Sequence, residues 1–475
     1  MTGSSLSLEC RVAVVGGGFA GSWVAYRLAQ RGVRTVLISA EDQLPAVSRA
    51  LSVGFVRRQV LDHVTTGGPD AFLDSSTTQD PGYREMMAGY LPREFEELTR
   101  IVSYSEFDEY LRPGDPATGV RVGLGDEVVA AVLARFEEFG GVQIQGRVTD
   151  FVVDEGICLG LRYQFDGVPG RIACNDVVLA SGGFCGLFAD GVGTNSGYLL
   201  GAYARHGGAL ANLELFARFA LGDLDRKVPC YPFEFDGPPR FLRAGEPAGE
   251  LAHALDDYAG DLLELDVFRH YWIPHLDMPH TAETSRGAFR MGPIKGFAMG
   301  GVAPSTAGNA PRNIHATGEC AYDLAVDSIS GKPFPTYLAR GGMLVDELTQ
   351  RSGSGSPTVD FAAGESQADA DPLLRKELGH RLDSFQDTGF SVTTAERFIQ
   401  WCRDERRRRR DERCHEDVDL LTLAEAYACS ALARTESRGF FYRPDFPAPD
   451  PALAGRHTVA RYDAATDRIV VGMHP

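Results

Sequence analysis

Residues 12–39, VAVVGGGFAGSWVAYRLAQRGVRTVLIS, constrain the fold more than any other stretch of this sequence. A short β-branched run from Arg11 to Val15 predicts a buried strand. Apolar residues then recur at helical spacing as far as Gly32, a residue type that accepts the left-handed conformation in which helices end. Thr35 to Ser39 predicts a second strand. The stretch therefore predicts a βαβ unit of the doubly wound, nucleotide-binding kind.

The turn between the first strand and the helix has the spacing G-x-G-x-x-G. Glycines let the backbone approach a pyrophosphate, and the free N–H groups at a helix N-terminus attract its negative charge. We therefore expect a nucleotide cofactor at Gly16, Gly18, Phe19, Ala20 and Gly21. The alternative is a tight strand-to-helix turn that binds no ligand.

The end of the second predicted strand determines how the ribose is held. An acidic residue often binds the ribose hydroxyls at this position. Here the position is Ser39, and Glu41 comes two residues later. We expect Ser39 to hydrogen-bond a ribose hydroxyl, at a site that has lost its negative charge.

Two later strands indicate which nucleotide is bound. One begins at Val177 and ends in the small residues Ala180, Ser181 and Gly182. The other begins at Asn313 and ends in Thr317, Gly318 and Glu319. Each alone is an ordinary exit from a strand. Together with the glycine-rich turn they read as three pieces of one FAD cradle, which favours FAD over NAD.

Composition limits the partners of the chain. Its 475 residues carry a formal net charge of -18, which repels nucleic acid. No run of about 18 apolar residues predicts a membrane span, and the N-terminus lacks a basic secretory signal region. The nine cysteines include no C-x-x-C pair and are interpreted as reduced, mostly buried thiols. We therefore expect a cytoplasmic protein that binds neither nucleic acid nor membrane.

Most of the chain resembles the flavoproteins of the succinate dehydrogenase, fumarate reductase and L-aspartate oxidase family. The most specific match is MGGVAPSTAGNAPRNIHATGECA, and ARTESRGFFYRPDFP is similar to the family's C-terminal signature. Weaker matches are DHVTTGG and GTNSGYLLGAYARHGGALANLEL, in which Asn195 and Ser196 replace Gly and Asp. These four matching stretches are residues 299–321, 433–447, 62–68 and 193–215.

The resemblance implies an α/β fold: a Rossmann-like FAD-binding domain, an inserted small α+β substrate (capping) domain and a C-terminal helical region. We expect the FAD-binding domain at residues 10–211 and 292–348, with the insert at 212–291. The Ser-, Gly- and acid-rich residues 349–372 read as a linker, and 373–475 as the helical region. The resemblance also implies FAD contacts at Ser48, Arg49 and Phe334.

Several family residues are missing, and their absence bears on the chemistry. No histidine stands in SRALSVG (48–54), where a covalent flavin would attach, so we expect non-covalent FAD. ARFALG (217–222) lacks the histidine of the family's Q-F-H-P stretch, and Gly296 and Ser328 replace a histidine and an arginine. Fumarate reduction needs a side chain positioned as a proton donor. In a flavin monooxygenase the cofactor itself performs the difficult chemical step, so fewer such side chains are needed.

This pattern is most similar to a branch that hydroxylates the amine of L-aspartate towards nitrosuccinate, in bacterial natural-product biosynthesis. We expect that reaction, with NADPH as a transient electron donor and O2 as co-substrate. The first alternative is an L-aspartate oxidase or fumarate reductase-like dehydrogenase. The second is a non-catalytic flavin-binding protein.

Candidate substrate ligands follow from the same stretches. Arg286 and Arg290 share one face of an extended segment and could grip carboxylates, although an exposed strand edge explains them equally well. Arg438 lies in the C-terminal signature, and Thr65 precedes Gly67 in a turn. We expect substrate contacts at Arg290, Arg438 and Thr65.

Two further clusters have less specific interpretations. The basic run RDERRRRRDERCHED (403–417) predicts a solvated helix face, or alternatively a dock for the phosphates of NADPH. His270, His275 and His280 are five residues apart, a spacing that suits neither one helix face nor a metal site.

Overall fold

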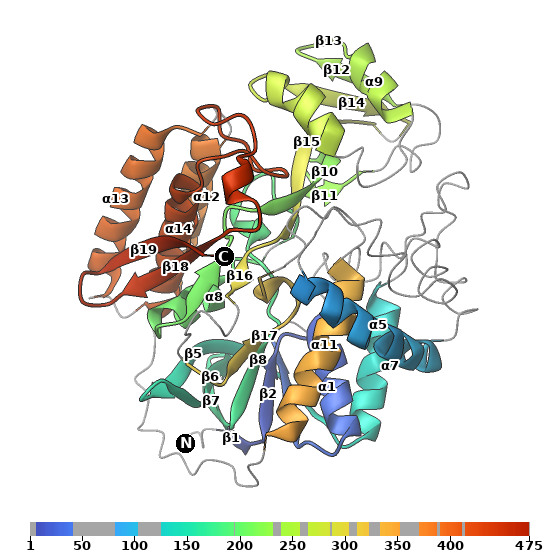
Figure 1. Ribbon diagram of the computed structural model, residues 1–475, viewed down its shortest axis with the longest axis vertical. Helices are drawn as coiled ribbons and strands as arrows, with labels where there is room; N and C mark the ends of the chain where they lie inside the picture. Colours follow the sequence, from blue (N-terminus) through green and yellow to red (C-terminus); the bar gives the residue numbers. More distant parts are fainter. Residues whose placement is uncertain are drawn as a thin grey trace.

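The computed structural model describes residues 6–40, 81–102, 125–193, 195–230, 239–256, 265–285, 287–303, 311–322, 333–351, 370–386, 390–410 and 414–474. Its centre is a five-stranded parallel sheet with the order β17-β8-β2-β3-β4 (Figure 1). These strands are β2 (Val12–Val15), β3 (Thr35–Ser39), β4 (Val142–Gln145), β8 (Asp176–Leu179) and β17 (Ile314–Ala316). Val12 pairs with Thr35 on one side and Asp176 on the other, so the predicted βαβ unit is confirmed.

Helices cover one face of this sheet (Figure 1). They are α1 (Phe19–Gln30), α5 (Pro81–Ile101), α7 (Gly125–Glu138) and α11 (Pro333–Gln350). Val12 and Val14 pack into the core beneath these helices, whereas Ala13 and Val15 pack into the core on the other face. This alternation follows from the two-residue period of a strand. Gly32 has a φ of +74°, as expected for the residue that ends α1.

A second sheet, with the order β1-β7-β6-β5, packs against the opposite face. Its strands are β1 (Leu6–Glu9), β5 (Arg147–Asp154), β6 (Ile157–Phe165) and β7 (Val168–Ala173). Strands β5 to β7 form antiparallel pairs. The parallel sheet is therefore covered on both faces, as its continuous apolar strands require.

The insert forms a six-stranded sheet with the order β11-β10-β15-β14-β12-β13 (Figure 1, yellow-green). Its strands are β10 (Phe216–Asp223), β11 (Val228–Pro229), β12 (Arg240–Arg243), β13 (Glu246–Pro247), β14 (His280–Thr284) and β15 (Gly287–Ala298). Helix α9 (Gly249–Asp256), π-helical turn η4 (Phe268–Trp272) and 3-10 turn η5 (Ile273–His275) accompany it. The boundary expected at residues 291/292 falls inside β15, because that strand runs without interruption out of the insert.

The C-terminal region contains three helices and an antiparallel hairpin. The helices are α12 (Pro372–Gln386), α13 (Val392–Arg410) and α14 (His415–Ala433), and the hairpin is β18 (His457–Asp463) and β19 (Arg468–His474). Strand β18 pairs with β9 (Ala209–Ala211), which also pairs with β16 (Gly301–Val302). The predicted C-terminal helical region is confirmed, and the structure adds two strands that continue the sheet of β9 and β16. Helix α8 (Tyr198–Arg205) packs against α14.

The basic run on α13 differs from the predicted solvated face. Arg406 is fully buried and donates to Glu425 at 2.6 Å and to Asp467 at 2.9 Å. Arg409 is 8% exposed and pairs with Asp417. The prediction was wrong at these two positions, because carboxylates on neighbouring elements neutralise the arginines that face inward. Arg407 and Arg408 do face solvent.

The nine cysteines are all free, and only Cys230 and Cys429 are not fully buried, as expected. Within the described residues, none of the helices combines the length and the apolar character that a bilayer crossing requires.

Candidate functional site

The glycine-rich turn lies where β2 meets α1, and its backbone leaves no room for side chains. Gly16 has a φ of +114°, and a Cβ added there would lie 2.2 Å from the carbonyl oxygen of Ala180. A Cβ on Gly21 would lie 2.0 Å from the carbonyl oxygen of Gly16. These close approaches bring the ends of β2 and β8 together at the N-terminus of α1, which is the geometry of a pyrophosphate site.

A cavity of about 460 Å³ opens at this turn, and its lining comes from seven separate parts of the chain. This volume is within the range of ligand sites, and we refer to the space as the nucleotide cavity. Seven of the predicted cofactor residues line it: Gly16, Gly18, Ser39, Ala180, Ser181, Gly182 and Glu319. The structure therefore brings together the three sequence segments that predicted the cradle.

Four other predicted cofactor residues lie beneath the cavity and do not line it. Phe19 and Ala20 are buried in the first turn of α1, next to Gly21. Gly318 has a φ of +63°, and a Cβ there would lie 2.9 Å from the Cβ of Ala20. These residues set the approach of β17 to α1, so they shape the cavity through packing.

Glu319 is the acidic residue of the nucleotide cavity. Its carboxylate accepts a long hydrogen bond from the N–H of Ala298 at 3.4 Å. A Cβ on Gly183 would lie 2.6 Å from the same carboxylate, so only glycine fits beside it. Burial raises the pKa of Glu319 to about 7, while the N–H groups of Ala298 and Gly183 oppose that rise. Near neutral pH this side chain can therefore either donate or accept a hydrogen bond.

The sequence analysis missed a second group of lining residues. Gly146, Arg147 and Val148 follow β4, and the N–H of Gly146 donates to the carbonyl of Ser39 at 2.8 Å. The remaining group is Asn195, Ser196, Gly197, Tyr198, Leu199 and Arg375. Gly146, which directly follows the short β4 segment, was the sequence signal that could have identified Gly146, Arg147 and Val148. Arg375 gave no signal, because its helix lies more than 200 residues further along the chain.

The nucleotide cavity fits the adenosine and pyrophosphate half of FAD. It combines a turn that excludes side chains, Ser39 at the end of β3 and two arginines in its lining. Thr317, directly before Gly318, is fully buried, and its hydroxyl has no hydrogen-bond partner among the described residues. A buried hydroxyl without a partner is costly, and a polar cofactor group would satisfy it.

Several predicted residues lie outside the described part of the structure. They are Ser48, Arg49, Thr65, Thr66 and Arg286. Phe334 belongs to α11, but its side chain is not described. The contacts predicted for these residues stay predictions.

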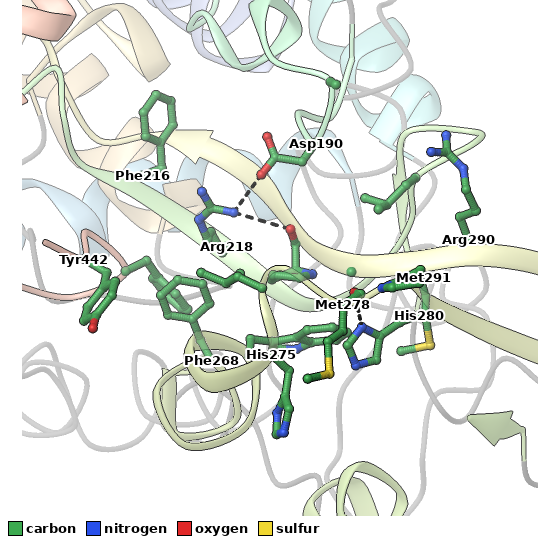
Figure 2. A pocket seen from close by; sticks show the side chains of 18 of the residues that line it. Asp190, Phe216, Arg218, Phe268, His275, Met278, His280, Arg290, Met291 and Tyr442 are labelled. Carbon is green, nitrogen blue, oxygen red and sulfur yellow. Dashed lines mark hydrogen bonds and ion pairs between the residues drawn. The ribbon is translucent and has the colours of Figure 1, made fainter. Parts of the chain in front are cut away.

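A second cavity, of about 480 Å³, lies between the sheet of the insert and the C-terminal region (Figure 2). It shares no lining residue with the nucleotide cavity. Strands β10 and β15 contribute Arg218 and Arg290, η4 contributes Phe268 and Trp272, and Tyr442 comes from the C-terminal region. We call it the cap cavity.

Charges in the cap cavity are paired through Asp190. Figure 2 shows Arg218 directed at Asp190, with an Nη1 to carboxylate distance of 2.7 Å. Lys295 also pairs with Asp190 and is 1% exposed. Burial raises the pKa of Asp190, but Lys295 and Arg218 outweigh burial and hold that pKa below its ordinary value. This buried cluster ties β10 and β15 to the loop after β8.

The two predicted substrate arginines occupy different surroundings. Arg290 lines the cap cavity, its side chain is 71% exposed, and its Nε donates to Asp225 at 2.7 Å. Arg438 lines neither cavity and donates twice to Glu436, at 2.8 Å each. Arg434, in the same C-terminal signature as Arg438, is fully buried between Glu214 and Glu436. No contact between Arg290 and Arg438 occurs among the described interactions.

The histidines do not form a metal centre in the described residues, where no cluster of three or more potential ligands occurs. His280 instead contacts the hydroxyl of Tyr271 at 3.0 Å, and His275 contacts the carbonyl of Tyr271 at 2.6 Å. Burial lowers the pKa of His280. These two histidines therefore hold the wall of the insert together.

Two family descriptions match the ends of this chain. Residues 11–125 match the FAD dependent oxidoreductases, and residues 411–475 match the fumarate reductase flavoprotein C-terminal region. L-Aspartate oxidase of Caulobacter vibrioides is 26% identical over 499 residues, which cover 92% of this chain and 90% of the relative. The similarity thus extends over nearly the whole of both proteins.

Solved structures share the fold at lower sequence identity. E. coli quinol fumarate reductase superposes with a TM-score of 0.73 at 17% identity, covering 98% of this chain and 97% of that one. Mycobacterium smegmatis Sdh1 gives a TM-score of 0.68 at 18% identity, covering 99% and 94%. Adenylylsulfate reductase of Archaeoglobus fulgidus gives 0.65 at 14% identity, covering 99% and 96%. The expected fold class is therefore confirmed.

Proposed function

Because this chain belongs to the succinate dehydrogenase, fumarate reductase and L-aspartate oxidase family of flavoproteins, we propose that it is an FAD-dependent oxidoreductase that oxidises the amine of L-aspartate or a similar dicarboxylate. The observation that carries the proposal is the end-to-end similarity to an L-aspartate oxidase, together with a cavity fitted to FAD. The relative favours the oxidase alternative over the N-hydroxylation that we expected from the sequence.

FAD supplies an acceptor for two electrons when it is bound. In the oxidase reaction, L-aspartate loses a hydride from Cα and a proton from nitrogen, and water hydrolyses the resulting imine to oxaloacetate and ammonia. The residues of the nucleotide cavity hold the cofactor: the glycine turn at the pyrophosphate, Ser39 at the ribose and Glu319 further along. SRALSVG offers no histidine for attachment, so the flavin is held without a covalent bond.

A dicarboxylate entering this acidic protein needs local cations. Each carboxylate loses its hydration on binding and requires charged donors in return. We propose Arg290 and Arg438 for this role, with Thr65 as a further hydrogen-bond donor. For Arg290 to bind substrate it must exchange or share its present partner, Asp225. Arg438 would likewise have to share Glu436.

N-hydroxylation of L-aspartate is the second candidate, and one observation favours it. The positions that carry acid and base groups in the family are occupied by ARFALG, Gly296 and Ser328. In the structure, residues 217–222 lie in β10 without a histidine. Such a site would depend on NADPH for electrons and on O2 for the transferred atom.

Anaerobic mixing of the purified holoenzyme with L-aspartate separates these candidates. The oxidase proposal expects the flavin absorbance to bleach without any nicotinamide, with one equivalent of oxaloacetate and ammonia per flavin. Further product should form once air is admitted, because O2 reoxidises the flavin and is reduced to hydrogen peroxide. D-Aspartate serves as the matched control.

Bleaching by NADPH alone, followed by aspartate-dependent O2 uptake and a product with an oxidised nitrogen, would replace the proposal with N-hydroxylation. If no donor reduces the flavin, the chain is a non-catalytic flavin-binding protein. Flavin that stays attached after acid denaturation would contradict the non-covalent site.

A further inference from the structure

The nucleotide cavity contains an arginine at the place where the adenosine of a dinucleotide lies. Arg147 begins β5 directly after Gly146, whose N–H donates to the carbonyl of Ser39 at 2.8 Å. This bond brings Arg147 to the carboxyl end of β3, where a βαβ unit binds the ribose. Arg147 lines the same cavity as Gly17 and Ser39. Any adenosine held by this turn must therefore pass close to Arg147.

The guanidinium of Arg147 is fixed on two sides. Both of its terminal nitrogens pair with the carboxylate of Glu416, in the first turn of α14. Its central carbon lies 4.6 Å from the ring centre of Tyr198. The hydroxyl of Tyr198 in turn donates to the carbonyl of Val148 at 2.6 Å. A guanidinium that is held by a bidentate carboxylate and rests on a ring is preorganised, because little freedom is left to lose on binding.

We propose that Arg147 binds the adenosine half of FAD, stacking its guanidinium on the adenine. Ser39 provides no carboxylate for the ribose, so the adenosine needs another hold, and a planar cation stacks well on an aromatic ring. Glu416 and Tyr198 act as positioning residues for this arginine. The proposal rests on FAD as the cofactor and not on the substrate, so its tests are independent of aspartate oxidation.

This contact also joins the cofactor to the C-terminal region. Helix α14 docks beside β5 and α8 through two neighbouring contacts: His415 of α14 lies 3.4 Å from Asp150 of β5, and Arg205 of α8 lies 2.8 Å from Asp419 of α14. Because the same helix supplies Glu416, binding of FAD stabilises the docked position of α14, and docking of α14 strengthens FAD binding by the same factor.

The test measures dissociation constants of FAD and of ADP, which is the adenosine diphosphate half of FAD, on the deflavinated protein. Arg147→Ala is compared with the parent protein, Arg147→Lys and Glu416→Gln. The matched control is Arg381→Ala. Arg381 also pairs with a glutamate, Glu377, lies 4.4 Å from a ring, that of Trp401, and is equally exposed, but it lines neither cavity.

We expect Arg147→Ala to weaken FAD and ADP binding by a similar factor, ~10- to 100-fold, the range of base stacking by a single side chain. Lysine should restore little, because it lacks the planar group. Glu416→Gln should have a smaller effect. The double variant Arg147→Ala/Glu416→Gln should bind FAD and ADP no more weakly than Arg147→Ala alone, because Glu416 acts only through Arg147. Arg381→Ala should bind both ligands normally.

The second measurement is hydrogen exchange with and without FAD. If Arg147 had only a structural role, replacing it would not change the effect of FAD on exchange. FAD should slow exchange in the first turns of α14 in the parent protein but not in Arg147→Ala. The proposal is overturned if Arg147→Ala binds both ligands within ~2-fold of the parent, or if Arg381→Ala loses as much affinity. It is also overturned if lysine restores full affinity. If Arg147→Ala does not fold, the affinities of Arg147→Lys and Glu416→Gln are used instead. The proposal is then overturned if both variants bind FAD and ADP within ~2-fold of the parent.

Discussion

Replacing Glu319 by glutamine should remove a pH-dependent loss of stability from the cofactor-free protein. Burial raises the pKa of this carboxyl from 4.5 to about 7 in the folded state. A carboxyl whose folded pKa is raised favours folding only while it is protonated, so stability falls as the pH rises from 4.5 through 7. At about 1.4 kcal/mol per pKa unit, the loss amounts to ~3 kcal/mol.

Urea unfolding of deflavinated parent and Glu319→Gln proteins at pH 4.5, 6 and 8 measures this effect. Between pH 4.5 and pH 8, the free energy of unfolding of the parent should fall by ~3 kcal/mol more than that of Glu319→Gln. Glu377→Gln, a change at an exposed glutamate of α12, provides the reference for the substitution itself. A difference between parent and Glu319→Gln that stays constant within ~1 kcal/mol would refute the conclusion that burial perturbs this carboxyl.

Three further predictions concern the cradle, the substrate and the C-terminal region. Gly16→Ala should be purified without flavin colour, because its Cβ would lie 2.2 Å from the carbonyl oxygen of Ala180; a yellow variant would contradict this geometry. Arg290→Ala and Arg438→Ala should each raise the KM for L-aspartate by at least ~30-fold while flavin absorbance is retained, and an unchanged KM would remove that arginine from the substrate site. Arg406→Ala should lower the free energy of unfolding by ~3–5 kcal/mol in urea titrations, because it removes a fully buried cation that pairs with both Glu425 and Asp467, whereas the exposed Arg408→Ala should change it by less than ~0.5 kcal/mol.

The predicted cofactor residues that the structure brings together in one cavity were recognised from local spacing. Gly16, Ser39, Ala180 and Glu319 each stand at the end of a strand that can be recognised by its own apolar run. In a parallel sheet the carboxyl ends of neighbouring strands meet at one edge. Strand recognition alone therefore sufficed to place these residues around one cavity.

Long-range partners account for what the sequence did not reveal. Arg147 and Glu416 are 269 residues apart, and Arg406 meets Asp467 across 61 residues. A charged side chain looks the same in a sequence whether it faces water or a buried carboxylate, so the run on α13 was taken for a solvated face. The same ambiguity applies to Arg290 and Arg438, whose carboxylate partners Asp225 and Glu436 could not be inferred from the sequence. Their role as substrate ligands stays a prediction.

The sequence by itself thus determined the βαβ unit and the three segments that meet at the nucleotide cavity, because backbone periodicity and the steric demand for glycine are properties of neighbouring residues. The tertiary structure decided which cations are neutralised, that β18 and β19 extend a sheet with β9, and that Glu416 of α14 pairs with Arg147 of the nucleotide cavity. These features depend on which distant surfaces pack together, since burial makes an unpaired charge costly and only the folded chain brings its partner within reach.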